Sequence, residues 1–304
     1  MDRFDAMRVF TRVADRRSFT RAALDLGLPR STVTDAIKEL ERRLGVKLLE
    51  RTTRVVRPTL DGEAYYQRCL SILSDMEDAE SVFVGAKPRG ILRVTAHSSL
   101  ARNFLFPGLP KFFDLYPDID LYLGEGDRLA DLIREGYDCA IRAGIPQDSD
   151  LIARQIALLD EVTLASPAYL EKHGVPSHPD ELAQGHRMVA FQSSATGTLL
   201  PLEFKVDGKI RELTLPARMT VEGADCYIAA AIQGLGLIQI PHYRADEFIK
   251  TGTLVQVLEE FPPEPTPVSL LYPRNRQLSP RVRVFLEWAS GQFSSRSGGA
   301  EGRG

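Results

Sequence analysis

The sequence predicts an α/β protein whose N-terminal part is a small, mainly helical module. Three observations predict this organisation. Residues 18–44 contain two short helical patterns separated by a tight turn, and residues 59–85 contain one long helical pattern. Beyond the stretch Gly85-Ala86-Lys87-Pro88-Arg89-Gly90, strand and helix patterns alternate, which is typical of a mainly parallel sheet covered by helices. The length of 304 residues allows two or three domains.

The bulk composition is that of an ordinary globular chain, with 43% apolar and 26% charged residues. No apolar run is long enough to span a bilayer, and the N-terminus lacks the apolar region of a signal peptide. The cysteines, Cys69, Cys139 and Cys226, are widely spaced, so neither a disulfide framework nor a zinc site is expected. These features predict a cytoplasmic protein with no membrane partner.

Charge is distributed unevenly along the chain. Residues 1–57 carry 14 Lys and Arg against 8 Asp and Glu, whereas residues 58–304 carry 24 against 33. A basic head on an acidic body predicts that a polyanion binds the head alone. The imbalance argues against a uniformly basic protein that coats nucleic acid.

The N-terminal module is expected to begin with a helix at residues 3–16, whose apolar side chains keep helical spacing. Ser18 and Ser31 are expected to cap the next two helices, because a Ser side chain accepts the free N–H groups of a first turn. Gly27-Leu28-Pro29 forms the turn between them. The second of these helices has one apolar stripe, made of Val33, Ile37, Leu40 and Leu44.

The opposite face of that second helix is polar and partly cationic. Its side chains are Arg30, Thr32, Thr34, Asp35, Lys38 and Arg42. Two helices joined by a tight turn, the second with a polar face, are typical of a helix-turn-helix that reads DNA. A surface helical hairpin with a solvated charged face is the alternative.

A basic segment, LLERTTRVVRPT, follows this helix at residues 48–59. It predicts a short β-ribbon, or wing, that carries three guanidinium groups. They belong to Arg51, Arg54 and Arg57. Arg binds phosphate in a bidentate manner and enters minor grooves. A solvated basic loop is the alternative, and the position directly after a reading helix favours the wing.

Thr59 is expected to cap a long helix that runs to about Gly85. The apolar side chains of this helix recur in alternating steps of four and three, the spacing of a coiled-coil seam. The seam consists of Tyr65, Cys69, Ile72, Met76, Ala79 and Phe83. This pattern predicts a helix that pairs with the same helix of a second copy. A core helix within one domain is the alternative.

The remaining chain is expected to form two lobes, each with its own series of strands and helices. Strands are expected at residues 91–96, 119–123, 139–142, 161–165, 188–191, 204–206, 212–215, 237–240 and 268–272. Helices are expected at residues 99–115, 128–135, 167–172, 226–233, 243–249 and 280–293. The Gly/Ser-rich tail from Ser294 is expected to be disordered.

Seven segments give the chain a resemblance to a known family. They read FTRAA at 19–23, STVTDAIKELE at 31–41, LGVKLLER at 44–51, TLDG at 59–62, EGYDCAIRAG at 135–144, AAIQGLGL at 230–237 and LSPRVRVF at 278–285. In this order and spacing, the chain resembles the LysR-type transcriptional regulators over essentially its whole length. The resemblance implies a winged helix-turn-helix, a linker helix and a two-lobed α/β effector domain like the periplasmic binding proteins.

The expected domain limits are 1–58 for the winged helix-turn-helix, 59–89 for the linker helix and hinge, 90–293 for the effector domain and 294–304 for the tail; lobe one is 90–160 with 267–293, and lobe two is 161–266. The resemblance implies three partners: double-stranded promoter DNA, a small-molecule effector and further copies of the chain. The copies would dimerise through the linker helix and pair into tetramers. RNA polymerase is a further candidate partner, because the family activates or represses nearby genes.

Position within the helix-turn-helix selects the candidate DNA contacts. They are Arg30, Ser31, Thr32, Thr34, Asp35 and Lys38 in the major groove, with Arg51 and Arg54 of the wing on the backbone or in the minor groove. Asp35 departs from the family pattern, because many members hold Arg or a neutral polar residue there. Asp accepts a hydrogen bond from cytosine but repels phosphate, so the base preference at this position stays open.

The cleft between the lobes is the expected effector site, because ligands of such folds bind at strand carboxyl ends and helix N-termini. The resemblance places the pocket at the same segments. The candidate effector-binding residues are Ser98, Ser99, Asp127, Arg142 and Ala143 in lobe one, and Thr163, Phe191, Gln192, Ser193, Glu222 and Asp225 in lobe two. Their mixture of donors, acceptors and one aromatic ring predicts a small aromatic or carbonyl-bearing metabolite. Plain helix capping by the serines and Asp225, and an ion pair of Arg142, are the alternatives.

No sequence pattern predicts an enzyme or a cofactor. The five histidines are scattered, most are expected to be solvated, and no metal-ligand spacing occurs. Gly234-Leu235-Gly236 lacks the third glycine of a dinucleotide motif and follows a helix, so it predicts a helix end. His97 beside Ser98 and Ser99 is the one weak candidate for the nucleophile and base that a two-lobed enzyme would need. A plain ligand carrier would have no use for the basic hairpin or the seam helix.

Overall fold

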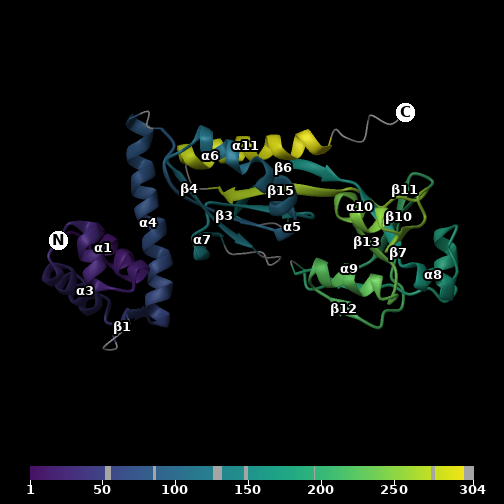
Figure 1. The fold of residues 1–304 in the computed structure, drawn as a ribbon, viewed down its shortest axis with the longest axis horizontal. Coiled ribbons are helices and arrows are strands. Elements are labelled where there is room, and N and C mark those ends of the chain that lie inside the picture. Colours follow the sequence, from purple (N-terminus) through teal and green to yellow (C-terminus); the bar gives the residue numbers. More distant parts are fainter. Residues whose placement is uncertain are drawn as a thin grey trace.

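The computed structural model describes residues 1–51, 56–84, 87–125, 132–146, 150–194, 196–274 and 278–297. Figure 1 shows the parts of the molecule in a row. A small N-terminal module lies against the long helix α4 (Leu60–Val84), lobe one lies on the other side of α4, and lobe two lies at the far end. Helix α11 (Pro280–Ser297), coloured yellow, runs along lobe one, so the end of the chain returns to the first lobe.

The N-terminal module combines helices with a two-stranded ribbon. Its elements are α1 (Arg3–Arg16), α2 (Phe19–Leu26), α3 (Arg30–Leu44), β1 (Leu49–Arg51) and β2 (Val56–Pro58). Ser18 caps α2 as predicted, because its hydroxyl accepts a hydrogen bond from the Arg21 N–H at 3.3 Å. Ser31 does not cap α3. The helix begins one residue earlier, directly after Pro29 in an extended conformation, so Ser31 lies inside the first turn.

The apolar stripe of α3 packs against α1 and α2. Val33, Ile37 and Leu40 are buried beside Phe10 of α1, as their helical spacing predicts. Leu44 differs from the prediction, because it is 39% exposed. The helix ends at this residue, and Gly45 turns the chain away in the left-handed conformation, so Leu44 does not reach the core.

The first turn of α4 lies directly on the ribbon. The Thr59 hydroxyl accepts a hydrogen bond from the Gly62 N–H at 2.9 Å, which confirms the predicted cap. The Thr59 N–H donates to the Leu48 carbonyl oxygen at 3.0 Å. A Cβ atom on Gly62 would lie 1.9 Å from that same oxygen, so this close approach requires glycine.

The start of the predicted seam is used inside the chain. Cys69 is fully buried in the core of the N-terminal module, and the ring centroids of Tyr65 and Phe10 are 5.5 Å apart. Burial raises the pKa of Tyr65 to about 12. These two positions therefore pack on α1 of the same chain, and the prediction that they face a second copy is wrong. Ile72, further along, is 37% exposed, and the side chains of residues 77–84 lie outside the described part.

Lobe one is built on a five-stranded sheet with the strand order β4-β3-β5-β15-β6. Its strands are β3 (Gly90–Ala96), β4 (Ile119–Glu125), β5 (Cys139–Ala143), β6 (Leu151–Leu159) and β15 (Thr266–Pro273). Strand β3 pairs in parallel with β4 and β5, whereas β15 is antiparallel to β5 and β6. The sheet is therefore mixed, and the predicted mainly parallel arrangement holds only for its first strands. The reason is that β15 enters this sheet on the way back from lobe two.

The chain from Ser98 to Leu115 is helical as predicted, but it is not one regular helix. It consists of α5 (Ser98–Leu100), a π-helical turn (Ala101–Leu105), a 3-10 turn (Phe106–Gly108) and α6 (Leu109–Leu115), and it is followed after β4 by α7 (Leu132–Glu135). Pro107 and Pro110 explain the irregularity, because proline lacks the N–H that a regular α-helix uses. Phe112 of α6 and Phe285 of α11 pack edge to face in the core of the lobe.

Lobe two contains shorter strands in three small sheets, ordered β13-β7-β14, β12-β8-β9 and β10-β11. Its elements are β7 (Glu161–Ala165), α8 (Pro167–His173), a 3-10 turn (Pro179–Ala183), β8 (Ala190–Gln192), β9 (Leu199–Leu200), β10 (Leu202–Val206), β11 (Lys209–Leu213), β12 (Thr220–Val221), α9 (Ala224–Ile232), β13 (Ile238–Pro241), α10 (His242–Lys250) and β14 (Val255–Gln256). Within these described sheets only β12 and β8 pair in parallel, so the predicted mainly parallel sheet is wrong for this lobe.

Two stretches of chain join the lobes. Strand β6 leads into β7 through Asp160, and the chain returns after β14 into β15. Strand β6 is absent from the predicted strands, because its sequence LIARQIALL shows no clear alternation of apolar and polar residues. At the other end, α11 continues to Ser297, so residues 294–297 are helical and not part of a disordered tail; residues 298–304 lie outside the described part.

Lobe one contacts α4 through strand β3. The Arg93 Nη2 atom donates a hydrogen bond to Gln67 Oε1 of α4 at 3.2 Å, and the guanidinium carbon lies 4.3 Å from the centre of the Tyr122 ring. The Arg93 backbone N–H donates to an Asp138 carboxylate oxygen at 2.9 Å. Strand β3 thus touches α4 and ends at the predicted effector segment. In the part of the chain that the structure describes, no helix combines the length and hydropathy needed to cross a bilayer.

Candidate functional site

The polar face of α3 is open to solvent. Arg30, Ser31, Asp35 and Lys38 are exposed, while Thr32 and Thr34 are half-buried at the edge of the face; all these positions are among those predicted. Neither Arg30 nor Lys38 forms an ion pair with any residue that the structure describes. Cationic groups on this face are therefore available to an external anion.

Thr34 differs from the other residues of this face. Its hydroxyl donates a hydrogen bond to the Arg30 carbonyl oxygen at 2.9 Å, within the same helix. The hydroxyl oxygen still has lone pairs that accept a hydrogen bond from a base. In this conformation the Thr34 hydroxyl is therefore left as an acceptor on the exposed side of the helix.

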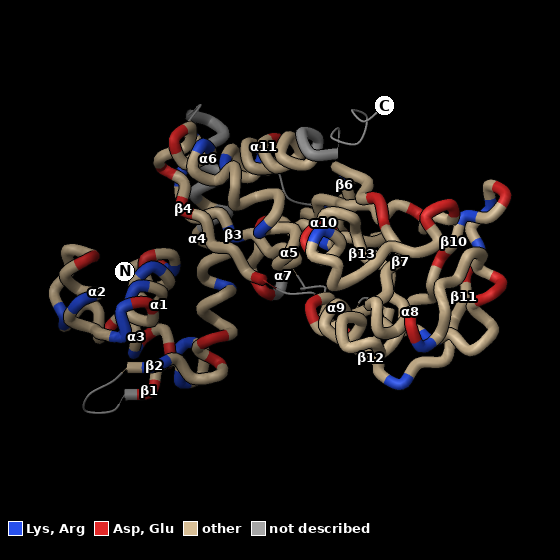
Figure 2. The backbone as a smooth tube through the Cα atoms, turned by 45° about the vertical axis from the view of Figure 1, so that its right-hand side comes forward, with Lys and Arg blue, Asp and Glu red and all other residues tan. Residues whose placement is uncertain are grey.

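Other basic side chains of the module are already paired. Arg16 of α1 bonds to Asp25 of α2 at 2.5 Å, and Arg42 of α3 pairs with the exposed carboxylate of Glu39. Figure 2 shows Lys and Arg, in blue, repeated along the helices of the module, with Asp and Glu, in red, among them; both colours also occur around β10 and β11 of lobe two.

The wing is partly described. Strands β1 and β2 pair antiparallel, with Glu50 opposite Arg57, and Arg57 is exposed. Arg51 ends β1, but its side chain is outside the described part, and Arg54 lies in the undescribed segment 52–55. The structure therefore confirms the ribbon and does not test these two predicted contacts.

Ser99 of lobe one meets a tyrosine of lobe two. Its side chain is buried, and its Oγ lies 2.9 Å from both His97 Nδ1 and the Tyr243 hydroxyl. Burial raises the pKa of Tyr243, so this hydroxyl keeps its proton at neutral pH. Tyr243 is the second residue of α10 and was not among the predicted site residues. The contact is long-range, and a tyrosine within a predicted helix gives no sequence signal for it.

Tyr243 leads to a second polar contact in lobe two. The next residue, Arg244, bonds to the Asp225 carboxylate of α9 at 2.5 Å. The structure thus brings the predicted residues Ser99 and Asp225 into one chain of contacts, which passes through α10. The alternative kept for Asp225, plain helix capping, does not hold, because no described side chain caps α9 and the Asp225 carboxylate is paired with Arg244.

Arg142 and its neighbours lie on the lobe-one side. The Arg142 side chain is buried, and its Nη1 and Nη2 donate to the Ile141 carbonyl oxygen at 3.0 Å and to Thr95 Oγ1 at 2.9 Å. Ala143, which ends β5, is exposed, and Ser98 at the start of α5 is half-buried. Asp127 is outside the described residues.

Thr163 has a structural partner inside lobe two. Its hydroxyl accepts a hydrogen bond from Gln239 Nε2 at 2.9 Å, and the same amide group bonds to the backbone of Glu203. The Thr163 side chain is 2% exposed, which places it in the packing of the lobe and not on an open cleft wall. The Phe191 ring packs edge to face on Tyr227, at a centroid distance of 5.1 Å.

The remaining predicted residues of lobe two lie in a turn or on the surface. Gln192 Nε2 donates to the Gly197 carbonyl oxygen at 2.8 Å, and the Ser193 N–H donates to the Thr198 carbonyl oxygen at 2.9 Å. Glu222 is exposed. Local contacts thus hold Gln192 and Ser193, which the sequence placed at a strand end without predicting this turn.

Glu161 lies between the two crossing stretches and was also missed by the sequence analysis. One of its carboxylate oxygens accepts a hydrogen bond from Thr266 Oγ1, on the returning strand, at 2.6 Å. Burial raises its pKa to about 7; the nearby Glu203 adds to the shift, while Thr266 and Arg244 oppose it. A carboxyl group at the junction of the lobes therefore changes charge near neutral pH.

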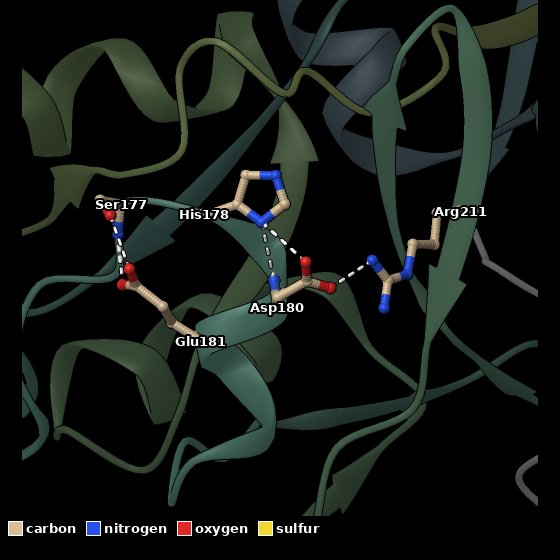
Figure 3. A network of polar contacts seen from close by, with 5 residues as sticks. All are labelled: Ser177, His178, Asp180, Glu181 and Arg211. Atoms are coloured by element: carbon tan, nitrogen blue, oxygen red, sulfur yellow. Dashed lines mark hydrogen bonds and ion pairs between the residues drawn. The ribbon is translucent and has the colours of Figure 1, made fainter.

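A separate polar network lies in lobe two, away from these residues. Figure 3 shows Asp180 between His178 and Arg211, with Glu181 turned towards Ser177. The His178 Nδ1 accepts from the Asp180 N–H at 3.2 Å, Arg211 pairs with Asp180, and Ser177 donates to Glu181. These contacts fix the 3-10 turn to β11 and explain its structure without a ligand.

In the described part of the chain, no group of three or more His, Cys, Asp or Glu side chains is placed to hold a metal ion. His186 differs from the expectation that most histidines are solvated. It is buried, and its Nδ1 lies 3.1 Å from the Tyr169 hydroxyl. Burial, with His173 nearby, lowers the pKa of His186.

Comparison with known families decides the identity. The model described as "Bacterial regulatory helix-turn-helix protein, lysR family" matches residues 4–63, and the model described as "LysR substrate binding domain" matches residues 85–294. The chain belongs to the LysR family of transcriptional regulators. It combines a DNA-binding helix-turn-helix with an effector-binding domain, as the resemblance implied.

Individual relatives support the same assignment over the whole length. The LysR-family chain is 36% identical over 293 residues to the uncharacterized HTH-type transcriptional regulator YhjC of Escherichia coli, covering 96% of this chain and 98% of that protein. It is 35% identical over 298 residues to an HTH-type transcriptional repressor of Pseudomonas aeruginosa, covering 97% and 93%. The solved structure of CrgA, a LysR-type regulator from Neisseria meningitidis, matches at 31% identity with a TM-score of 0.57, covering 95% and 98%.

Proposed function

We propose that this LysR-family regulator binds operator DNA with α3 in the major groove and the β1–β2 wing on the flanking backbone or minor groove. The exposed, unpaired cations Arg30 and Lys38 are the observation that carries the proposal. Ser31, Thr32 and Thr34 lie beside them and offer hydrogen bonds to base edges, and Asp35 accepts one from cytosine. Arg51 and Arg54 provide the wing contacts in this proposal.

The acting unit in this proposal is a dimer joined by α4, and two dimers pair into a tetramer. The support for the dimer is Ile72, the seam residue after the buried Cys69 on α4. It is exposed in the single chain, so it offers an apolar contact to a second copy. The regulator acts in the cytoplasm, where its DNA is found, with RNA polymerase as a partner at the promoter. It works by binding and not by catalysis.

The effector site in this proposal lies between the lobes, around Ser99, Arg142 and Asp225. It binds a small aromatic or carbonyl-bearing metabolite, because the Ser99 and Tyr243 hydroxyls can donate to a carbonyl oxygen once their mutual hydrogen bond opens. The other candidates for this site are Ser98, Asp127 and Ala143 in lobe one and Phe191, Gln192, Ser193 and Glu222 in lobe two. The buried Thr163 supports the site only through the packing of lobe two. The effector shifts the lobe arrangement only by its different affinity for the two arrangements.

Salt-dependent DNA binding tests the DNA-binding proposal. Fluorescence anisotropy would follow binding to the DNA upstream of the protein's own gene over a series of salt concentrations. We expect the Lys38→Ala variant to reduce the slope of log K against log salt by about one, because one phosphate-neutralising group is lost. Lys205→Ala, an exposed lysine of β10, is the matched control and should leave the slope unchanged.

Two results would contradict the proposal. Equal slopes for wild type and Lys38→Ala would remove Lys38 from the DNA contacts and leave the proposal without one of the two cations that carry it. Equal affinity of the wild type for the upstream DNA and for a scrambled duplex, at every salt concentration, would remove sequence-specific binding altogether.

A further inference from the structure

Glu41 is the buried charged side chain of α3, a helix whose residues are all described. It is 7% exposed, whereas Asp35, Lys38, Glu39 and Arg42 on the same helix are exposed. A buried carboxylate needs hydrogen-bond donors to compensate for the water it has lost. Its partners therefore show what it is used for.

Glu41 bonds to the start of the wing. Its Oε1 accepts from the Leu48 N–H at 2.9 Å and from the Leu49 N–H at 3.2 Å, and its Oε2 accepts from Lys47 Nζ at 2.9 Å. Burial favours the neutral acid, but these hydrogen bonds outweigh it and hold the pKa of Glu41 below its usual value. The side chain is therefore a carboxylate at neutral pH, with both oxygens in use.

The two leucine amides need this acceptor. The side chains of Leu48 and Leu49 are buried in the core that also contains Ile37 and Leu40 of α3, so their N–H groups are drawn inside with them. The Leu48 carbonyl oxygen is bonded on the other side to the Thr59 N–H, at the entry to α4. The strand that begins the wing is thus held between α3 and α4.

The connecting turn is tied to α4 by one further bond. Gly45 is in the left-handed conformation, Val46 is 39% exposed, and the Lys47 carbonyl oxygen accepts a hydrogen bond from the Thr59 hydroxyl at 2.6 Å. Thr59 therefore holds the start of the wing to α4, whereas the Glu41 hydrogen bonds hold it to α3. These bonds join the reading helix and the wing.

We propose that Glu41 is a positioning residue: it fixes the position of the wing relative to α3, so that the wing and α3 contact one DNA duplex at the same time. The inference rests on the proposed DNA contacts of α3 and the wing. Glu41 itself touches no DNA, because it is buried beneath the reading face. Its effect is on the number of DNA contacts that α3 and the wing make at the same time.

Three substitutions separate this positioning role from charge and from folding. Glu41→Asp keeps the charge but shortens the side chain by one methylene group, so the carboxylate no longer reaches the two amides. Glu41→Gln removes the charge but keeps an oxygen acceptor at the same reach. Glu171→Ala is the control, because it removes the same charge from an exposed position of α8 in lobe two, away from the helix-turn-helix.

Binding to the upstream DNA would be measured as a function of salt, together with hydroxyl-radical footprinting. We expect Glu41→Asp to reduce the salt slope by about one, to weaken binding roughly tenfold and to lose protection at the outer flanks while the central protection stays. We expect Glu41→Gln and Glu171→Ala to share the wild-type slope and the full footprint. Far-UV circular dichroism would confirm that each variant is folded.

The outcomes decide the inference in each case. A folded Glu41→Asp variant with the wild-type slope and flank protection would overturn it. If Glu41→Asp does not fold, Glu41→Gln still decides: the wild-type slope and footprint support positioning by hydrogen bonds, and a reduced slope overturns it. Failure of the proposed function is distinguishable, because it would appear as an unchanged slope in Lys38→Ala, whose residue makes no contact with the wing start.

Discussion

The reading face of α3 and the region between the lobes present their polar groups in opposite ways. On α3, Arg30 and Lys38 are exposed and carry no partner among the described residues. Between the lobes, Ser99 is bonded to Tyr243, and Arg142 is bonded to Thr95. These two proposed DNA contacts are thus free among the described residues, whereas an effector bound at the proposed site would replace hydrogen bonds that the protein makes with itself.

The largest expected effect tests whether the N-terminal module and the effector domain unfold independently. Ile37 is fully buried under the reading face, so Ile37→Ala should destabilise the N-terminal module by about 2–5 kcal/mol. Ile238, fully buried in lobe two, is the matched position, and Ile238→Ala should destabilise the effector domain by a similar amount. Urea unfolding followed by hydrogen exchange would show which region opens. If Ile37→Ala opens both regions equally, the regions are one cooperative unit and the contrast between them loses its basis.

The second effect is the pH dependence of the effector domain. The pKa of Glu161 is raised from 4.5 to about 7, so the native state holds this proton more tightly than the unfolded state does. Stability should therefore fall as pH rises from about 4.5 to about 7, by about 1.4 kcal/mol per pH unit, and then level off. Glu161→Gln should remove this fall, giving a difference from wild type of about 3 kcal/mol between about pH 5 and about pH 8.

The control for Glu161 is Glu259→Gln, which changes an exposed carboxylate of lobe two. Urea unfolding at the two pH values would give the free energies of unfolding. A Glu161→Gln protein with the same pH dependence as Glu259→Gln would show that Glu161 is ionised in both states, and the charge change at the lobe junction would be wrong.

The smallest effect tests the contact across the lobes. Tyr243→Phe removes the hydroxyl that meets Ser99 and leaves the ring, so the effector domain should lose about 0.5–1.5 kcal/mol of stability. Tyr116→Phe, on a half-buried tyrosine of lobe one, is the matched control and should change the stability less. Small-angle scattering of the Tyr243→Phe protein should show a wider spread of lobe arrangements. Unchanged stability and scattering would mean that the hydroxyl pair does not hold the lobes together.

The sequence predicts the elements better than the contacts between them. Helix α1, the Ser18 cap and the Thr59 cap depend on neighbouring residues, and the structure contains each of them. The cap at Ser31 fails because Pro29 already fixes where α3 begins. The predicted pairing of Cys69 with a second copy fails for a different reason. A coiled-coil spacing is the same whether the helix packs on a second copy or on its own chain, and Cys69 packs on its own chain.

In the effector domain, too, the sequence predicts individual residues but not the contacts between them. Ser99 and Asp225 were found from their places at helix starts, but the residues that join them, Tyr243 and Arg244, come from a helix far along the chain. Glu161 resembles any strand-start glutamate until the returning strand places Thr266 beside it. A single sequence contains no signal for such pairs, because burial and partner are properties of the folded chain.

Strand β3 has a mechanical consequence for signal transfer. Its Arg93 side chain holds Gln67 of α4, and its far end passes directly into Ser98 and Ser99. Arg93 is the fourth of the seven residues of β3, so about 10 Å of strand, at about 3.3 Å per residue, separates it from the strand end at Ala96. Hydrogen bonds to β4 and β5 hold this stretch in the sheet. If an effector binds beside the serines, we expect a displacement there to reach the α4 contact at Arg93 through this short, paired stretch of strand.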